Sequence, residues 1–200
     1  MLLFVVMRKN GAYHHGNLRE SLLGAAVDLI AEVGPSGFTL REVARRAGVS
    51  HNAPYRHFSD RDDLMAAVAS QGFAQLAAEM KKAAELETEP VRRLKQAGLA
   101  YVSFALSRPE HFAVMFDAPV SISKNPGCAE SSEKAFGVLR QLVNDCQQKG
   151  ALPPGDSLDR ALLSWSVVHG IAKLAIGGRL PFKTKAKVLR FAEFVIDERR

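Results

Sequence analysis

Residues 50–58, read as Ser-His-Asn-Ala-Pro-Tyr-Arg-His-Phe, bring amide, guanidinium, imidazole and phenol groups together in a very short segment. Asn and Arg side chains match the hydrogen-bonding edges of DNA bases in the major groove, and phenol or imidazole groups suit phosphate oxygens. A proline fits a helix only in its first turn. We therefore expect a short helix that begins near residues 50–52, with Pro54 in its opening turn and Phe58 as its apolar anchor.

The preceding residues predict the supports that such a short helix needs. Thr39 and Glu42 have the spacing of a capping box, which opens a helix by satisfying its first backbone N–H groups. Apolar residues follow at three- and four-residue steps, and Gly48 supplies the left-handed exit that ends a helix. An earlier amphipathic helix is expected to end at Gly34-Pro35. Short helices joined by a tight turn at residues 48–50 predict a helix-turn-helix, whose second helix enters the major groove of DNA.

These residues resemble a known family. The run FTLREVARRAGVSHNAPYRHFSDRDDL, residues 38–64, is similar to the DNA-binding domain of TetR/AcrR-type transcriptional regulators. The run YHHGNLRESLLGAAVDLIAEVGPSGFT, residues 13–39, resembles the arm and first helix of the same family. The resemblance covers residues 13–68, which we expect to form the DNA-binding domain.

The resemblance implies roles for individual residues. Tyr55 matches a tyrosine that binds a phosphate, and Thr39 matches a threonine that caps the second helix and touches the DNA backbone. Arg61 stands where the family usually has a phosphate-binding lysine, and its forked guanidinium keeps the charge. We expect Asn52 and Arg56 to reach base edges. The complete expected DNA-binding set is Thr39, Ser50, His51, Asn52, Tyr55, Arg56, His57 and Arg61.

Three further features bear on DNA binding. His14, His15 and Arg19 belong to an arm or first turn that could approach phosphates. Pro54 replaces the aliphatic residue that the family usually has before the tyrosine, which changes how the helix begins. The chain carries a formal net charge of +6, but residues 8–64 hold nearly equal numbers of basic and acidic side chains. The affinity for DNA must therefore come from local placement of charge.

The rest of the chain also reads as helical, so the expected fold class is all-α. Helices are predicted near residues 59–84, 91–106, 112–116, 130–149, 157–176 and 183–197, with a loop over residues 117–129. In the resembling family this larger part, here residues 75–200, senses a ligand and forms dimers. We expect a homodimer through residues 157–176 and 183–197, because a pair of recognition helices reads a palindrome.

The segment Trp-Ser-Val-Val-His-Gly, residues 165–170, is similar to the Trp-x-x-x-His-Gly (WHG) signature of one C-terminal subtype. Gly170 would let a neighbouring helix approach closely. Aromatic and apolar residues in this part suggest a pocket for an apolar or aromatic small molecule, with ordinary core packing as the alternative. The candidate ligand-binding residues are Tyr101, Phe104, Phe112, Met115, Phe116, Trp165 and His169.

Other functions were weighed against a ligand-responsive repressor. A DNA-binding protein without a small-molecule effector remains open. No glycine-rich phosphate loop, nucleophile elbow or metal-ligand spacing occurs, so we expect no enzyme activity, catalytic residue, cofactor or metal site. A redox sensor based on Cys128 and Cys146 is the remaining alternative.

The two cysteines form no disulfide framework, which favours a reducing, cytoplasmic location. The opening MLLFVV is too short for a signal peptide or a membrane span, and Met7 is an alternative start to Met1. We expect no membrane association.

Overall fold

The computed structural model describes residues 18–117 and 125–198, which form helices and contain no strand. The expected all-α class is therefore confirmed for the described part of the chain. The elements are α1 (Leu18–Val33), α2 (Leu40–Arg46), the 3₁₀ turn η1 (Pro54–Arg56), α3 (Arg61–Glu85), α4 (Pro90–Ser107), α5 (Pro109–Phe116), α6 (Pro126–Gln148), α7 (Ser157–Ile176) and α8 (Lys185–Glu198).

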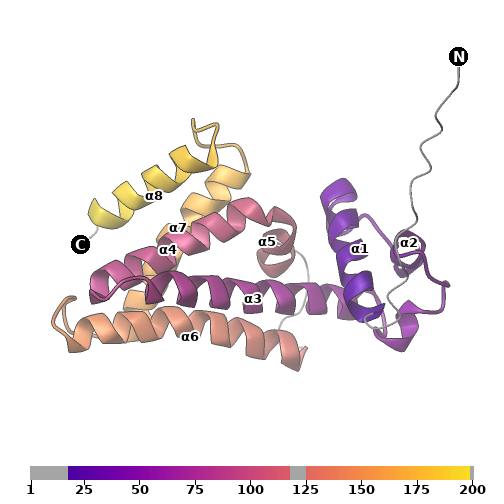
Figure 1. Cartoon of the computed structure of the whole chain (residues 1–200), viewed down its shortest axis with the longest axis horizontal. Helices are drawn as coiled ribbons and strands as arrows, with labels where there is room; N and C mark the ends of the chain where they lie inside the picture. The colour runs from indigo at the N-terminus through magenta and orange to yellow at the C-terminus, as the bar shows by residue number, and fades with distance from the viewer. Residues whose placement is uncertain (1–17, 118–124, 199–200) are drawn as a thin grey trace, which may run out of the picture.

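The helices α1 and α2 form a small unit with η1 at one end of the molecule (Figure 1). The predicted capping box is present: the Thr39 side chain accepts a hydrogen bond from the Glu42 N–H, and the Glu42 side chain accepts one from the Thr39 N–H. Leu40, Val43 and Ala44 are buried, so this short helix is held mainly by the apolar face that it packs against its neighbours.

The longest element, α3, leaves this unit and runs through the rest of the molecule (Figure 1). Asp60 caps it by accepting a hydrogen bond from the Asp63 N–H, and Asp62 and Asp63 place negative charge at the positive end of the helix dipole. Buried residues occur along its length from Leu64 to Ala84. One continuous helix therefore belongs to both parts of the chain.

The C-terminal helices pack around α3. The helix α4 returns beside α3 in the opposite direction, whereas α6 runs beside α3 in the same direction (Figure 1). Both α7 and α8 pack on α4, and α7 also contacts α6. Gly98 of α4 lets α7 and α8 pack closely against it. A Cβ at this position would lie only 3.2 Å from the Ile196 side chain and 3.4 Å from the Val168 side chain.

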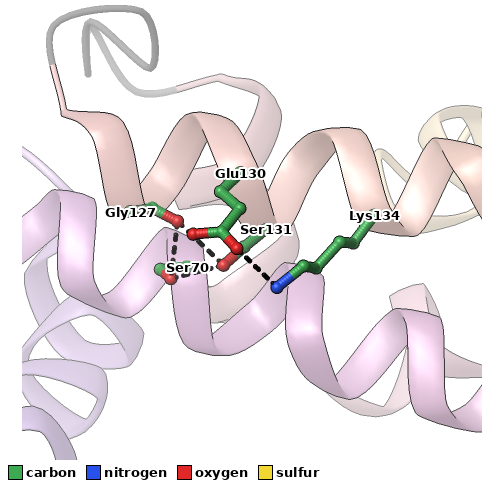
Figure 2. A network of polar contacts seen from close by, with 5 residues as sticks. All are labelled: Ser70, Gly127, Glu130, Ser131 and Lys134. Carbon is green, nitrogen blue, oxygen red and sulfur yellow. Dashed lines mark hydrogen bonds and ion pairs between the residues drawn. The ribbon is translucent and has the colours of Figure 1, made fainter.

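Polar contacts fix the register of α6 on α3. The Asn125 amide donates to Asp63 Oδ1 at 3.4 Å, and the hydroxyls of Ser70 and Ser131 lie 2.8 Å apart. The Ser131 hydroxyl donates to the carbonyl oxygen of Gly127 at 2.9 Å, and the Ser70 hydroxyl, which also lies 3.3 Å from that oxygen, donates to Ser131 (Figure 2). The start of α6 is thus attached to the first turns of α3.

One predicted boundary was wrong. We expected a loop over residues 117–129, but α6 already begins at Pro126. Asn125 caps it by accepting a hydrogen bond from the Cys128 N–H, and a proline is well suited to the first helical position because it has no N–H to satisfy. Residues 118–124 of the expected loop lie outside the described part.

The arm residues His14 and His15 and the two possible starts, Met1 and Met7, also lie outside the described residues. Within residues 18–117 and 125–198, no helix is both long enough and apolar enough to cross a membrane.

Replacement by alanine should have opposite effects on stability at two of the glycines. Gly24 lies exposed in α1 with no atom near the position of a Cβ, so Gly24→Ala should raise the free energy of unfolding by about 0.5–1 kcal/mol. Gly48 has a φ of 70°, so Gly48→Ala should lower it by about 1–2 kcal/mol. Chemical denaturation measures both variants, and a stabilising Gly48→Ala would contradict the assigned backbone geometry.

Candidate nucleic-acid interface and internal cavity

The segment expected to form a recognition helix is a single 3₁₀ turn, Pro54–Arg56, and not an α-helix that begins near Ser50. Proline is the physical reason. An α-helix would need a hydrogen bond from the N–H of residue 54 to the Ser50 carbonyl, and Pro54 has no N–H. The Ser50 carbonyl instead accepts from the Ala53 N–H at 2.9 Å, a bond that spans three residues as in a 3₁₀ helix.

The turn has one inward face and one outward face. Ala53, Pro54 and Phe58 are buried and attach the turn to the protein. The outward face carries most of the expected DNA-binding set, and its members are Ser50, His51, Asn52, Tyr55, Arg56 and His57, all of them exposed. Tyr55 keeps 54% of its surface accessible. A large aromatic side chain is seldom left exposed to water without a function. Beside an amide and a guanidinium group, it is typical of a surface that binds nucleic acid.

Thr39 is exposed, and its hydroxyl is occupied by the capping box. The hydroxyl donates to Glu42 Oε2 at 2.9 Å, and the Thr39 N–H donates to the same oxygen at 2.8 Å. These hydrogen bonds, led by the one from the Thr39 side chain, lower the pKa of Glu42. Thr39 therefore shapes the start of α2 while its side chain remains at the surface.

Three arginines near this surface have different surroundings. Arg19, expected to approach phosphates, lies over the ring of Phe58 at 5.5 Å, where it braces the 3₁₀ turn. Arg46 pairs with Glu32 at 2.5 Å and so ties α2 to α1, a contact that the sequence did not reveal. Arg61 lies 3.4 Å from Asp62 in an exposed pair that water screens, so its charge stays available to a phosphate.

The second candidate site is a cavity of about 400 Å³ between α3, α4, α5, α6 and α7. This size falls within the range of small-molecule sites. Its lining is mostly aromatic and aliphatic, and consists of Phe73, Leu76, Met80, Tyr101, Phe116, Ser132, Glu133, Ala135, Phe136, Leu139, Leu162 and Trp165. A smaller cavity of about 120 Å³ between α4, α7 and α8 shares Met80, Tyr101 and Leu139 with it.

A hydrogen-bonded cluster forms one wall of the larger cavity. The Trp165 indole N–H donates to the Tyr101 hydroxyl at 3.1 Å, and the hydroxyl lies 2.8 Å from His169 Nδ1. The indole can only donate, so the hydroxyl accepts from Trp165 and shares one further hydrogen bond with His169. Burial raises the pKa of Tyr101 and lowers that of His169, so both side chains stay neutral at physiological pH.

The expected ligand residues divide into two groups. Tyr101, Phe116 and Trp165 line the larger cavity, whereas Phe104, Phe112 and Met115 line neither cavity and are almost fully buried in the core. His169 also lines neither cavity and packs against Phe112 and Phe116. The spacing of apolar residues along one helix does not predict which of these side chains line a cavity and which pack against another helix.

The sequence reading missed lining residues on α3 and α6. Phe73, Leu76 and Met80 recur at three- and four-residue steps on α3, and Phe136 and Leu139 do so on α6. These spacings mark a helical face that meets the rest of the protein. Given that α3 and α6 are neighbours, these spacings would have been enough to predict that both helices line the cavity.

Within the described ranges, no group of three or more His, Cys, Asp or Glu side chains could hold a metal ion. Cys128 and Cys146 are free and buried, and burial raises the pKa of both thiols. A protonated, enclosed thiol reacts slowly with oxidants, which does not favour the redox-sensor alternative.

A series of contacts links α1 to the helix α5 beside the cavity. The Gln71 amide donates to Glu20 of α1 at 3.3 Å, and its oxygen lies 3.1 Å from His111 Nε2 of α5. The oxygen can only accept, so the His111 ring donates from Nε2. Burial lowers the pKa of His111, and the nearby positive charge of Arg108 lowers it further. The residue next to His111, Phe112, packs on Tyr101, so this series of contacts reaches from α1 to the cavity wall.

Comparison with known proteins agrees with this geometry. Residues 22–68 match the bacterial regulatory proteins of the tetR family, and residues 94–198 match the tetracyclin repressor-like C-terminal domain. A protein of unknown function from Rhodococcus sp. RHA1 is similar in structure, with a TM-score of 0.80 and 36% identity, over 94% of this chain and 97% of that one.

Two regulators are similar in sequence. The HTH-type transcriptional repressor Rv3405c of Mycobacterium tuberculosis is 44% identical over 48 residues, which are 24% of this chain and 26% of that protein. The HTH-type transcriptional regulator HbdR of Aromatoleum sp. is 32% identical over 153 residues, 76% of this chain and 66% of HbdR. The chain thus spans about a quarter of the length of the first relative and about two thirds of the second.

A helix-turn-helix at one end of an all-α fold, with a larger helical part behind it, is the arrangement of a helix-turn-helix regulatory protein. The chain belongs to the tetR family of bacterial regulatory proteins.

The lowered pKa values of His111 and His169 predict a pH dependence of stability. Each ring is held neutral in the folded protein, so the unfolded chain takes up protons first as the pH falls below about 6.5. The free energy of unfolding should therefore be highest above pH 6.5 and decrease between pH 6.5 and 5. His111→Gln, which can still donate to Gln71, should reduce that decrease, and a His111→Gln/His169→Gln variant should reduce it further. Denaturant titrations at each pH measure this, and an unchanged slope in both variants would contradict the assignment.

Proposed function

We propose that this chain is a sequence-specific DNA-binding transcriptional regulator, a repressor that a small molecule controls. The observation that carries the proposal is the two-faced 3₁₀ turn. Asn52 and Arg56 point outward beside Tyr55, while Pro54 and Phe58 hold the turn from within. An exposed ridge of base-reading and phosphate-binding groups on a buried anchor is the arrangement that major-groove recognition needs.

The proposed roles follow from the chemistry of the exposed groups. Asn52 and Arg56 read base edges, while Tyr55 and Arg61 bind phosphates on either side of the groove. Ser50, His51, His57 and Thr39 make further contacts to the DNA backbone. Arg61 is suited to its role because its partner Asp62, at 3.4 Å, is an exposed neighbour that a phosphate can displace.

We propose that residues 13–68 perform DNA binding and that residues 75–200 bind the effector and form the dimer. The cavity lined by Tyr101, Phe116 and Trp165 supports a small-molecule effector that is apolar or aromatic. The effector would control DNA binding by favouring one conformation over another, which requires different affinities for the two. Regulation by a partner protein alone, the alternative, has no feature of comparable size in its favour.

The proposed homodimer uses α7 and α8. Leu163, Leu174 and Phe194 expose 49%, 47% and 59% of their surface, which is unusual for large apolar side chains. Gly170, between the two leucines on the same helical face, has no atom within 4 Å of the position of a Cβ. The close approach that we expected of Gly170 is thus not made within the described chain, and the second copy would make it.

The segment from Trp165 to Gly170 supports assignment of the C-terminal domain to the Trp-x-x-x-His-Gly subtype, because Tyr101 bonds both aromatic members of the signature. We also propose that the regulator acts in the cytoplasm as a DNA-binding protein that needs no cofactor and is not an enzyme.

Selection of bound DNA from a random pool at defined salt tests the proposal. We expect a palindrome with half-sites about 34 Å apart. Arg56→Ala should weaken binding to that site by about 1–3 kcal/mol and relax one position of the motif. Arg61→Gln should weaken binding to all sequences and reduce the slope of affinity against salt by about 1. Arg92→Ala, an exposed change far from the turn on α4, is the control. An unchanged motif with Arg56→Ala would refute the base-reading assignment.

Sedimentation measures the dimer. The native chain should sediment as a dimer at micromolar concentration, and Leu174→Asp or Phe194→Asp should shift it to a monomer because a charge cannot be buried unpaired. Leu86→Asp, at a side chain that is 79% exposed and outside α7 and α8, should leave the dimer intact. A monomeric native chain would contradict the proposal.

A further inference from the structure

The charge in the lining of the larger cavity restricts the chemistry of its ligand. Among the lining residues that the structure describes, Glu133 is the one charged side chain, and none of them is a lysine, arginine or histidine. Glu133 is exposed at the edge of the α6 face that carries Ala135 and Phe136. Within the described ranges Glu133 forms no ion pair, whereas the preceding carboxylate on the helix, Glu130, pairs with Lys134 at 2.6 Å (Figure 2). The rim of the cavity therefore carries one uncompensated negative charge.

Several aromatic rings lie in the lining of the larger cavity, beside its aliphatic side chains. Trp165 lies 6.2 Å from Phe116 and 6.1 Å from Phe136, and Phe116 meets Phe73 edge-on at 5.6 Å. The negative faces of such rings attract a cation within about 6 Å of their centres, most strongly where water is excluded. An anion would meet both these faces and the Glu133 carboxylate at a cost.

Among the described lining residues, the polar side chains are Glu133, the Ser132 hydroxyl, and Tyr101 and Trp165, which hydrogen-bond each other. The Tyr101 hydroxyl is already hydrogen-bonded to both Trp165 and His169. A carboxylate such as Glu133 can only accept hydrogen bonds. Polar recognition in this cavity therefore favours a ligand that brings a positive charge.

The smaller cavity has basic lining residues where the larger one has an acidic residue, and this difference sets the direction of the ligand. Its charged lining residues are Lys95 and Arg160, and Lys95 is held by Glu193 and Asp197 at 2.8 Å each. The cation would be repelled by Arg160 and would lie at the Glu133 end. An apolar tail could extend past Tyr101 and Met80, which both cavities share.

We propose that the effector of this regulator is a lipophilic organic cation, bound among Phe73, Phe116, Phe136 and Trp165 with its positive charge near Glu133. The inference rests on the proposed function in taking this cavity as the effector site, and it adds the charge class of the effector. Glu133 is the residue that selects for charge.

Two probes of nearly equal shape and opposite charge test the proposal. Tetraphenylphosphonium and tetraphenylborate are titrated into the full chain, and the fluorescence of Trp165 reports binding, because it is the single tryptophan of the chain and lines the cavity. We expect tetraphenylphosphonium to bind more tightly. Glu133→Gln should weaken it by about fivefold and leave the borate unweakened, since a rim charge contributes about 1 kcal/mol. Phe136→Leu should weaken the cation by about three- to tenfold.

The matched control is Glu130→Gln, which removes a carboxylate from the same helix outside the cavity lining and should leave both affinities unchanged. Glu133→Lys should reverse the preference between the two probes. Equal affinities in the native chain, no response to either probe, or equal effects of Glu133→Gln and Glu130→Gln would overturn the inference. Tighter binding of tetraphenylborate would also overturn the inference about charge, but it would still support the cavity as a ligand site. The DNA selection tests the proposed regulator independently of either result.

Discussion

The burial of α3 along its whole length is the constraint on which the other features depend. The helix begins beside the 3₁₀ turn, and further along, Phe73, Leu76 and Met80 form part of the cavity wall. A helix buried over this length cannot bend freely, because its neighbours pack against it closely. Any ligand that moves the cavity face of α3 must therefore move its first turn, unless the packing with α1 or α6 yields. The helix α3 is thus the element that the 3₁₀ turn adjoins and that the cavity shares.

Much of the fold could be predicted from the sequence because local signals agreed with one another. The capping box at Thr39 and Glu42, the exit at Gly48 and the Asp60 cap each fix a helix end within a few residues. Family resemblance then identified the exposed turn and its base-reading candidates. Pro54 showed the limit of this reasoning. It was placed correctly in the first turn, but a missing N–H shortened the whole element to one 3₁₀ turn.

The cavity was harder to predict, for a physical reason. Tyr101, Phe116 and Trp165 line it, while Phe104 and Phe112 look equivalent in the sequence and are simply buried. Whether an apolar side chain faces a void depends on how helices distant in sequence meet. The Arg19–Phe58 and Arg46–Glu32 contacts depend on that same packing, and no periodicity of a single helix encodes it.

Asp63 carries a consequence for how such a chain can evolve. One of its oxygens accepts from the Ser59 backbone, next to the recognition turn, and the other accepts from the Asn125 side chain at the start of α6. A replacement here disturbs a loop and a helix start that are distant in sequence. Positions 63 and 125 should therefore change together among descendants of this chain, as a correlated pair, whereas the exposed side chains at 52 and 56 are under no such packing constraint.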